Sequence, residues 1–74
     1  MKTREKILLQ TLDLFNQKGV DQVSVLEISQ TMGISYGNLT YHFKKKDDLV
    51  QALYVQMQHE LDAAINHLVQ RIFE

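Results

Sequence analysis

Residues 25–43 of the chain, VLEISQTMGISYGNLTYHF, have the pattern of two short helices joined by a tight turn. Ser24 can cap the first helix, and Glu27 stands three residues later, which predicts a capping box. Gly33 follows that helix at the position where a left-handed residue commonly ends one. Ser35 can then cap the second helix. This pattern predicts a helix-turn-helix, a motif that inserts its second helix into the major groove of DNA.

The second helix, expected over residues 36–43, has one apolar side and one polar side. Leu39 and Phe43 would face inward. The residues left to face outward are Tyr36, Gly37, Asn38, Thr40, Tyr41 and His42. An outward face so rich in hydrogen-bonding groups favours contact with DNA.

Four of the outward positions are placed to approach base edges: Tyr36, Gly37, Asn38 and Thr40. Gly37 would let the backbone approach DNA closely, although glycine is also tolerated near a helix end. Asn38 can pair with adenine, whereas Tyr36 suits a thymine methyl group or a phosphate. Ser24 can present its hydroxyl and a helix N-terminus to a phosphate, but helix capping explains this serine equally well.

Tyr41, His42 and Lys46 can all donate hydrogen bonds to phosphate oxygens, which positions a protein on the duplex without reading its sequence. Aromatic residues at the end of a short helix also complete cores, and His42 has the alternative of packing under its helix. Because Leu39 and Phe43 already fill the inward side, phosphate contact is the favoured interpretation for Tyr41 and Lys46.

The segment before the motif predicts one longer helix over about residues 3–18. Its inner stripe is Leu8, Leu12 and Phe15, widened by Ile7, Thr11 and Leu14, with the spacing of a core-facing surface. Gly19 should end this helix. In the connector over residues 20–23, Val20 and Val23 are both expected to turn into the core.

A fourth helix should begin near residue 46 and continue to residue 74, since no glycine or proline interrupts it. Its apolar stripe is Leu49, Leu53, Met57, Leu61, Ala64, Leu68 and Ile72. The first two can pack on the preceding helices, but nothing in this chain can cover the stripe from Met57 onward. An uncovered apolar stripe usually marks a partner surface. We therefore expect a DNA-binding domain over residues 1–55 and a separate distal segment over residues 56–74.

The chain resembles the N-terminal domain of TetR-family transcriptional regulators over about residues 4–53. The matching residues, in order, are Arg4, Ile7, Leu8, Leu14, Phe15, Gly19, Gly33, Gly37, Leu39, Tyr41, His42, Phe43, Lys46 and Leu49. A helix-turn-helix pattern alone is weakly specific, whereas this whole string at these spacings is strongly specific. Two positions depart from the family: Thr11 stands where it usually has Ala, and Thr40 where it usually has Tyr.

The resemblance implies an all-α fold, a three-helix homeodomain-like bundle with a helix-turn-helix plus a long fourth helix. It also implies a sequence-specific DNA-binding domain of a repressor that binds a pseudo-palindromic operator as a homodimer. The DNA-contacting residues would be Ser24, Ser35, Tyr36, Gly37, Asn38, Thr40, Tyr41, His42 and Lys46. A small-molecule effector would bind a larger C-terminal domain beyond residue 74, so we expect the chain to be part of a longer bacterial or archaeal cytoplasmic protein.

Charge is divided along the chain in a way that agrees with this interpretation. Residues 1–46 hold seven lysines and arginines against four acids, a net charge of +3, whereas residues 47–74 hold one arginine against five acids, a net charge of −4. The positive part is the one that resembles a reader of DNA, and positive charge supplies the salt-sensitive share of DNA affinity. A run of lysines is otherwise most often a solvated loop.

Other classes of function find little support. The absence of cysteine excludes disulfides and thiolate metal sites. His59 and His67 would share a helix face, but nothing defines an open metal coordination position, and no glycine-rich phosphate loop occurs. We expect neither an enzyme nor a cofactor, and no membrane segment, since no apolar run approaches spanning length. The rival to DNA binding is a small helical interaction or oligomerisation module acting through the fourth helix.

Overall fold

The structure is a computed structural model that describes residues 1–73, and within that range it contains helices and no strands. Its elements are α1 (Thr3–Lys18), a short 3₁₀ turn η1 (Val20–Gln22), α2 (Val25–Met32), α3 (Tyr36–His42) and α4 (Lys46–Phe73). The predicted all-α class is confirmed. Glu74, the last residue of the predicted fourth helix, lies outside the described residues.

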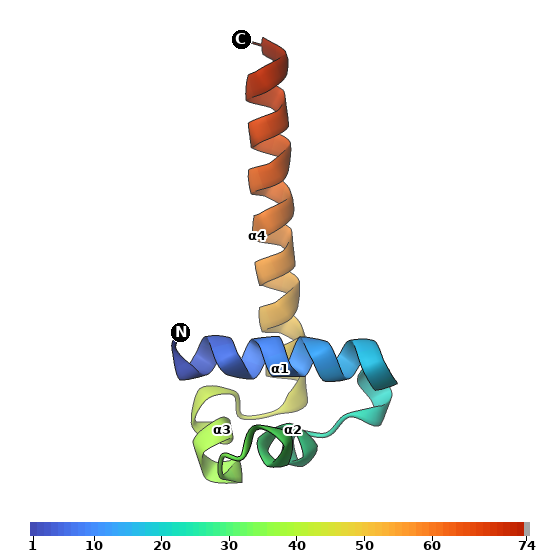
Figure 1. Ribbon diagram of the computed structural model, residues 1–74, viewed down its shortest axis with the longest axis vertical. Helices are drawn as coiled ribbons and strands as arrows, with labels where there is room; N and C mark the ends of the chain where they lie inside the picture. The colour runs from blue at the N-terminus through green and yellow to red at the C-terminus, as the bar shows by residue number, and fades with distance from the viewer. Residues whose placement is uncertain (74) are drawn as a thin grey trace.

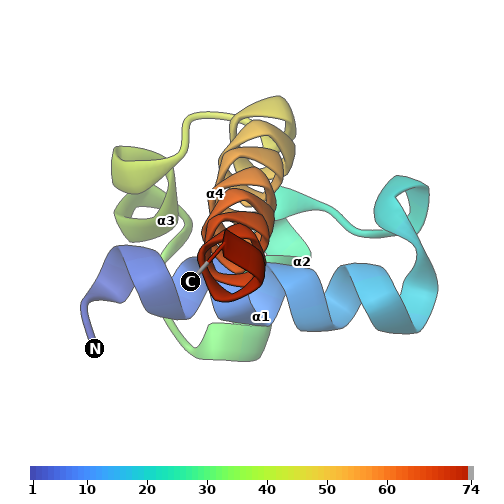
Figure 2. The ribbon, with the colours of Figure 1, turned by 90° about the horizontal axis from the view of Figure 1, so that it is seen from above.

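The molecule has two parts of different shape, spanning 50 × 24 × 17 Å in total. We call residues 1–53 the head and residues 54–73 the stalk. In the head, α1 lies across α2 and α3, and the stalk rises from it on the side away from α2 and α3 (Figure 1). Seen along the stalk, α4 stands over the middle of the head, with α3 on one side and the α1–α2 connector on the other (Figure 2).

One hydrophobic cluster joins the four helices of the head. Its buried side chains are Ile7, Leu8, Leu14, Val23, Ile28, Leu39, Phe43, Leu49 and Leu53. Every helix contributes to this list, so the positions of α2 and α3 are fixed by α1 above them and by the start of α4. No buried residue follows Leu53 in the described part of the chain.

The buried face of α1 is centred differently from the prediction. Its most buried residues are Ile7, Leu8, Thr11 and Leu14, whereas Leu12 and Phe15, expected at the centre, are only partly buried. The buried face follows the helices that α1 packs against most closely, which are α2 and the start of α4. Thr11 fits this interior because its hydroxyl donates a hydrogen bond of 2.7 Å to the Ile7 carbonyl.

The connector after α1 confirms one predicted core residue and corrects another. Gly19 ends the helix with φ 89°, a backbone angle that favours glycine. Val23 is buried, as expected, but Val20 is 42% exposed. Val20 begins the turn η1 at the edge of the head, where the connector runs over the surface, so its side chain does not reach the core.

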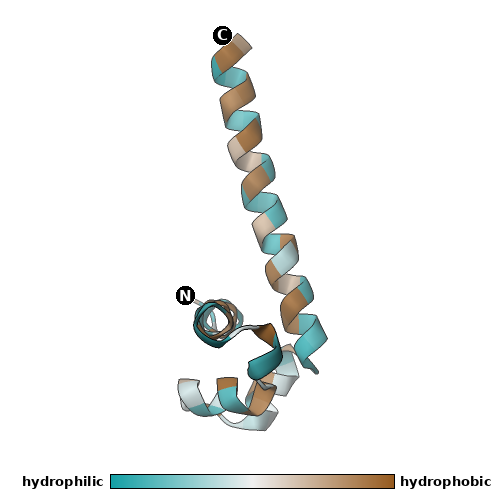
Figure 3. Cartoon of the chain, turned by 90° about the vertical axis from the view of Figure 1, so that its right-hand side faces the viewer, coloured by the Kyte–Doolittle hydropathy of each residue, from teal (hydrophilic) through white to brown (hydrophobic). Residues whose placement is uncertain are grey.

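The fourth helix runs without a break through all 28 residues of Lys46–Phe73. At a rise of about 1.5 Å per residue this corresponds to about 42 Å. Leu49 and Leu53 are buried in the head, whereas Met57, Leu61 and Leu68 are each more than half exposed. Hydrophobic patches recur along the whole length of the stalk (Figure 3). No helix within residues 1–73 is both long and apolar enough to cross a lipid bilayer.

Candidate nucleic-acid interface

The turn between α2 and α3 is held by backbone hydrogen bonds around Gly33. This glycine has φ 72° and ψ 26°, the left-handed conformation that the sequence predicts. Its N–H donates to the Gln30 carbonyl at 3.2 Å, and the N–H of Ile34 donates to the Ser29 carbonyl at 3.1 Å. These two bonds form a Schellman motif, and Ile34 packs against the core beyond it. The turn therefore fixes the angle at which α3 leaves α2.

The start of α2 carries only half of the predicted capping box. Ser24 Oγ accepts a hydrogen bond of 3.0 Å from the Glu27 N–H, which is the expected cap. The Glu27 carboxylate does not reach back to the Ser24 N–H, because it forms an ion pair with Lys18 Nζ at the end of α1. Ser24 itself is exposed.

The helix α3 is short but well anchored. Ser35 Oγ accepts a hydrogen bond of 3.0 Å from the Asn38 N–H, so Ser35 caps this helix as predicted. Leu39 is fully buried and Phe43 is 4% exposed, which confirms both as inward residues. The helix ends at His42, one residue earlier than expected, because Phe43 adopts an extended conformation with φ −137°.

The residues predicted to face outward divide into two groups. Tyr36 and Tyr41 are 52% and 83% exposed, and Gly37 and Asn38 are also exposed. Thr40 and His42, which complete the predicted set on α3, are only partly exposed. The outward face is therefore narrower than predicted, and it is centred on the first turn of the helix.

Gly37 is not required by anything inside the molecule. A Cβ atom added at this position would meet no other atom within 4 Å, and φ is not in the left-handed region. Glycine in a helix interior nonetheless lowers helix stability by about 1 kcal/mol relative to alanine. Its use at an exposed position of a seven-residue helix favours a close approach by something outside the chain.

The hydroxyl of Thr40 is already engaged within α3. It donates to the Tyr36 carbonyl at 2.9 Å and lies 3.3 Å from the Gly37 carbonyl. The sequence pattern places Thr40 toward base edges, where a threonine hydroxyl can donate a hydrogen bond. With its proton directed at the helix backbone, the hydroxyl oxygen offers an outside partner an acceptor instead.

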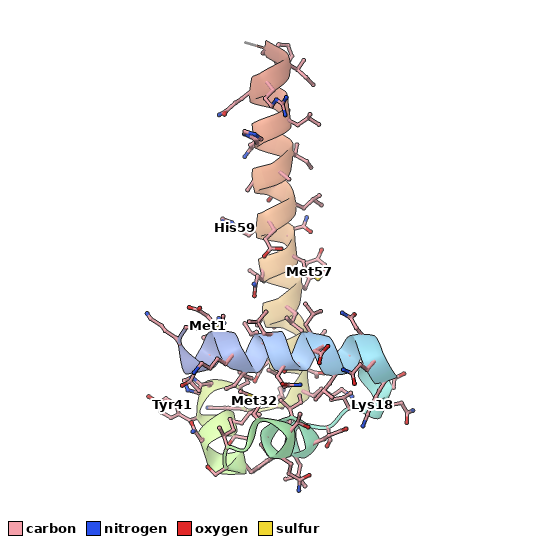
Figure 4. All side chains as sticks on the ribbon, viewed as in Figure 1. Met1, Lys18, Met32, Tyr41, Met57 and His59 are labelled. Atoms are coloured by element: carbon pink, nitrogen blue, oxygen red, sulfur yellow. The ribbon has the colours of Figure 1, made fainter. Side chains whose placement is uncertain are left out.

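Tyr41 and His42 lie edge to face, with ring centroids 5.2 Å apart and planes at 89°. Tyr41 projects from the end of the head opposite Lys18 (Figure 4). His42 instead lines an open groove between α1 and α4, together with Arg4 and Asp48. This placement agrees with the alternative that His42 packs under its helix.

Lys46 is the first residue of α4 and is partly exposed, next to the exposed Lys44 and Lys45. These lysines follow α3 after the buried Phe43, so the positive run begins two residues beyond the end of that helix. The guanidinium of Arg4 lies 5.1 Å from the centroid of the Phe43 ring and adds a further cation near the end of α3. Within residues 1–73, no three His, Asp or Glu side chains gather into a group that could hold a metal ion.

Sequence reasoning missed the parts played by Lys18 and Arg4. Lys18 stands in the last turn of α1, where a cation is favoured on any helix, but its side chain pairs with Glu27 on α2. Arg4 stacks on Phe43, which is far from it in sequence. Neither contact has a local pattern, since each joins residues of different elements. All nine predicted site residues lie in the head, on or beside the starts of α2 and α4 and along α3.

Comparisons with known proteins agree with this geometry. Residues 7–53 match the family described as bacterial regulatory proteins, tetR family. HTH-type transcriptional regulators of Staphylococcus aureus strains USA300 and NCTC 8325 are each 40% identical over 57 residues, which cover 77% of this chain and 29% of theirs. The crystal structure of a TetR-family transcriptional regulator from Marinobacter aquaeolei VT8 is 39% identical, with a TM-score of 0.86 over 89% of this chain and 32% of that one. The chain therefore spans less than a third of the length of these relatives.

Proposed function

Because the chain belongs to the TetR family, as a helix-turn-helix DNA-binding domain of a transcriptional regulator, we propose that it reads DNA through α3 as part of a repressor. The observation that carries this proposal is the first turn of α3. That turn is capped by Ser35, carries the exposed Gly37 and Asn38, and lies on the side of the head away from the stalk. A major groove about 12 Å wide admits a helix presented in this way.

Base reading belongs to Tyr36, Gly37 and Asn38 in this proposal. The Asn38 side chain is exposed and can pair with adenine through two hydrogen bonds. Gly37 lets the backbone beside it come close to the base edges, since no side chain stands between. Tyr36, about half exposed, contacts a thymine methyl group or the neighbouring phosphate.

Phosphate contacts surround this centre. The hydroxyls of Ser24 and Ser35 accept backbone N–H groups, so each keeps its own proton to donate to a phosphate oxygen. Tyr41 and Lys46 provide donors on the other side of α3, and charged donors such as Lys46 form the stronger bonds. Thr40 and His42 contribute less, because the first is bonded to its own helix and the second faces the groove.

The proposal also covers how the whole regulator binds its operator and how the chain is divided. Two copies bind a pseudo-palindromic operator, since one recognition helix spans only a few base pairs and the half-sites lie a helical turn or a multiple apart. Residues 1–55 form the DNA-binding domain, and residues 56–74 begin the part that dimerises and responds to a small-molecule effector. The exposed apolar stripe of the stalk supports this division.

The same stripe supports a second candidate function. The chain could act as a helical interaction module through the stalk, with no role for DNA. The two functions make different demands on α3. A module that binds partners through the stalk has no use for the exposed Gly37 in the first turn of α3.

Selection from a pool of random duplexes tests the proposal. We expect this chain to enrich a recurring half-site, and Gly37→Leu to lose that enrichment because the leucine holds α3 away from the groove. The substitution is suited to this test, because a Cβ atom added at Gly37 meets no other atom of the chain within 4 Å. Duplexes recovered with the composition of the input pool, at both low and moderate salt, would contradict DNA reading by this chain.

A further inference from the structure

We propose that Lys18 is a positioning residue that keeps the Glu27 carboxylate away from the start of α2, so that the backbone N–H of Ser24 stays available to a DNA phosphate. This inference rests on the proposed function, because it concerns the phosphate contact at Ser24. It assigns a role in DNA binding to a side chain that itself makes no contact with DNA.

The first step is the choice of partner open to Glu27. A Ser followed three residues later by Glu normally forms a reciprocal pair, in which the Glu side chain accepts the N–H of the Ser. In this chain the Ser24 half of the pair is present, with a hydrogen bond of 3.0 Å. The Glu27 half is absent, and its carboxylate pairs with Lys18 instead. Lys18 and the Ser24 N–H therefore compete for one carboxylate.

The second step is the effect of that choice on an approaching phosphate. The first N–H groups of a helix have no acceptor within the helix, and they attract anions together with the helix dipole. A carboxylate folded back onto the Ser24 N–H would occupy the same donor as the phosphate and would repel it. Between residues 22 and 46, Glu27 is the only acid. Its position consequently has a large influence on the charge that DNA meets there.

The third step is the location of Lys18. It is the last residue of α1, at the end of the head opposite Tyr41 (Figure 4). Its side chain is 48% exposed and that of Glu27 is 27% exposed, so the pair lies at the surface and adds little to stability. Breaking it should redirect Glu27 without unfolding the head.

Hydrogen exchange of the Ser24 amide tests the rearrangement without DNA. In Lys18→Gln the carboxylate is released and closes the capping box, so we expect exchange of this amide to slow about two- to tenfold, the range of one net hydrogen bond. In Lys18→Gln with Glu27→Ala no carboxylate remains, and exchange should return to the parent rate. Unchanged exchange in Lys18→Gln would overturn the inference, whether or not the chain binds DNA.

A double-mutant cycle on duplex affinity, at one fixed salt concentration, tests the consequence. Coulomb effects of separate charges on DNA add, whereas a rearrangement makes the two substitutions interact. We expect Lys18→Gln to weaken binding about three- to tenfold when Glu27 is present and by a smaller factor in the Glu27→Ala background. An equal loss in both backgrounds would mean that Lys18 contacts phosphate directly, and would overturn the inference. If the parent chain binds no duplex, the proposed function is wrong. The hydrogen-exchange experiment would still show whether the Glu27 carboxylate moves to the Ser24 N–H.

Discussion

At the scale of single residues, the two serines that precede α2 and α3 form the same kind of helix cap. In each, the hydroxyl accepts a backbone N–H three residues later at 3.0 Å and stays at the surface. The capping role and the phosphate-binding role, which the sequence presents as alternatives, are compatible in such a group, because the hydroxyl proton is not used by the cap. Phosphate contact by Ser24 or Ser35 therefore does not require either helix to lose its cap.

Asn38 gives the sharpest prediction about sequence reading. Replacing it with alanine removes a bidentate partner for adenine but leaves the helix and its cap in place, since the Asn38 backbone makes the bond to Ser35. We expect Asn38→Ala to relax preference at one or two base pairs by about 1–3 kcal/mol, with non-specific binding nearly unchanged. Competition between duplexes that differ at single positions measures this effect. Uniform weakening across all of these duplexes would show that Asn38 does not read bases.

Lys46 should behave in the opposite way. As a phosphate contact it has no sequence preference, so Lys46→Ala should weaken binding to every duplex and lower the slope of log affinity against log salt by about one. Lys45→Ala is the matched control, because its side chain is exposed and neighbouring but was not predicted as a contact. Titrations at several salt concentrations decide the question. A slope that falls equally in both variants would assign the effect to general charge and not to Lys46.

At the scale of the elements, α3 is held to the core by Leu39 and by Phe43 at its end. Leu39 is fully buried, while the adjacent Asn38 is exposed. Leu39→Ala should lower the free energy of unfolding by about 2–5 kcal/mol, through lost burial and the cavity left behind. Asn38→Ala should stay within about 0.5 kcal/mol of the parent. Urea titration monitored by circular dichroism measures both values, and similar midpoints for the two variants would mean that Leu39 does not anchor α3.

The elements also show what a sequence can and cannot predict. The bounds of α1 and α2 agree with prediction because their signals are local: Gly19 and Gly33 at the ends and Ser24 at a start. The Lys18–Glu27 pair and the exposure of Val20 were not predictable in this way, since both depend on how α1 meets the connector and α2. For the candidate site, the residues of α3 were predictable from periodicity. The position of His42 at the groove between α1 and α4 depends on how the helices pack, and the internal bond of Thr40 depends on the orientation of its hydroxyl, so periodicity predicts neither.

At the scale of the whole molecule, the stalk carries the exposed apolar stripe and the head carries the proposed DNA-binding surface, at opposite ends of a 50 Å particle. Burying the stripe of the stalk against a second copy would remove several Leu, Ile and Val side chains from water, each worth about 1.5–3 kcal/mol when fully covered. Association itself costs at least about 4 kcal/mol in lost translational and rotational freedom. We therefore expect concentration-dependent self-association of moderate strength.

The double variant Leu61→Lys with Leu68→Lys tests this expectation, because both side chains are more than half exposed and lie outside the core of the head. It should remain monomeric and keep the unfolding midpoint of the head. Sedimentation equilibrium of the parent and of the variant gives the comparison. A parent that stays monomeric at high concentration with a helical stalk would rule out self-association through the stripe.

The claim that α3 enters the major groove is tested most directly by following backbone amide resonances of the chain as a selected duplex is added. The account predicts the largest shifts at Ser24, along residues 35–42 and at Lys46, with the stalk beyond Met57 little changed. Shifts confined to residues 57–72, with α3 unperturbed at saturating duplex, would contradict it.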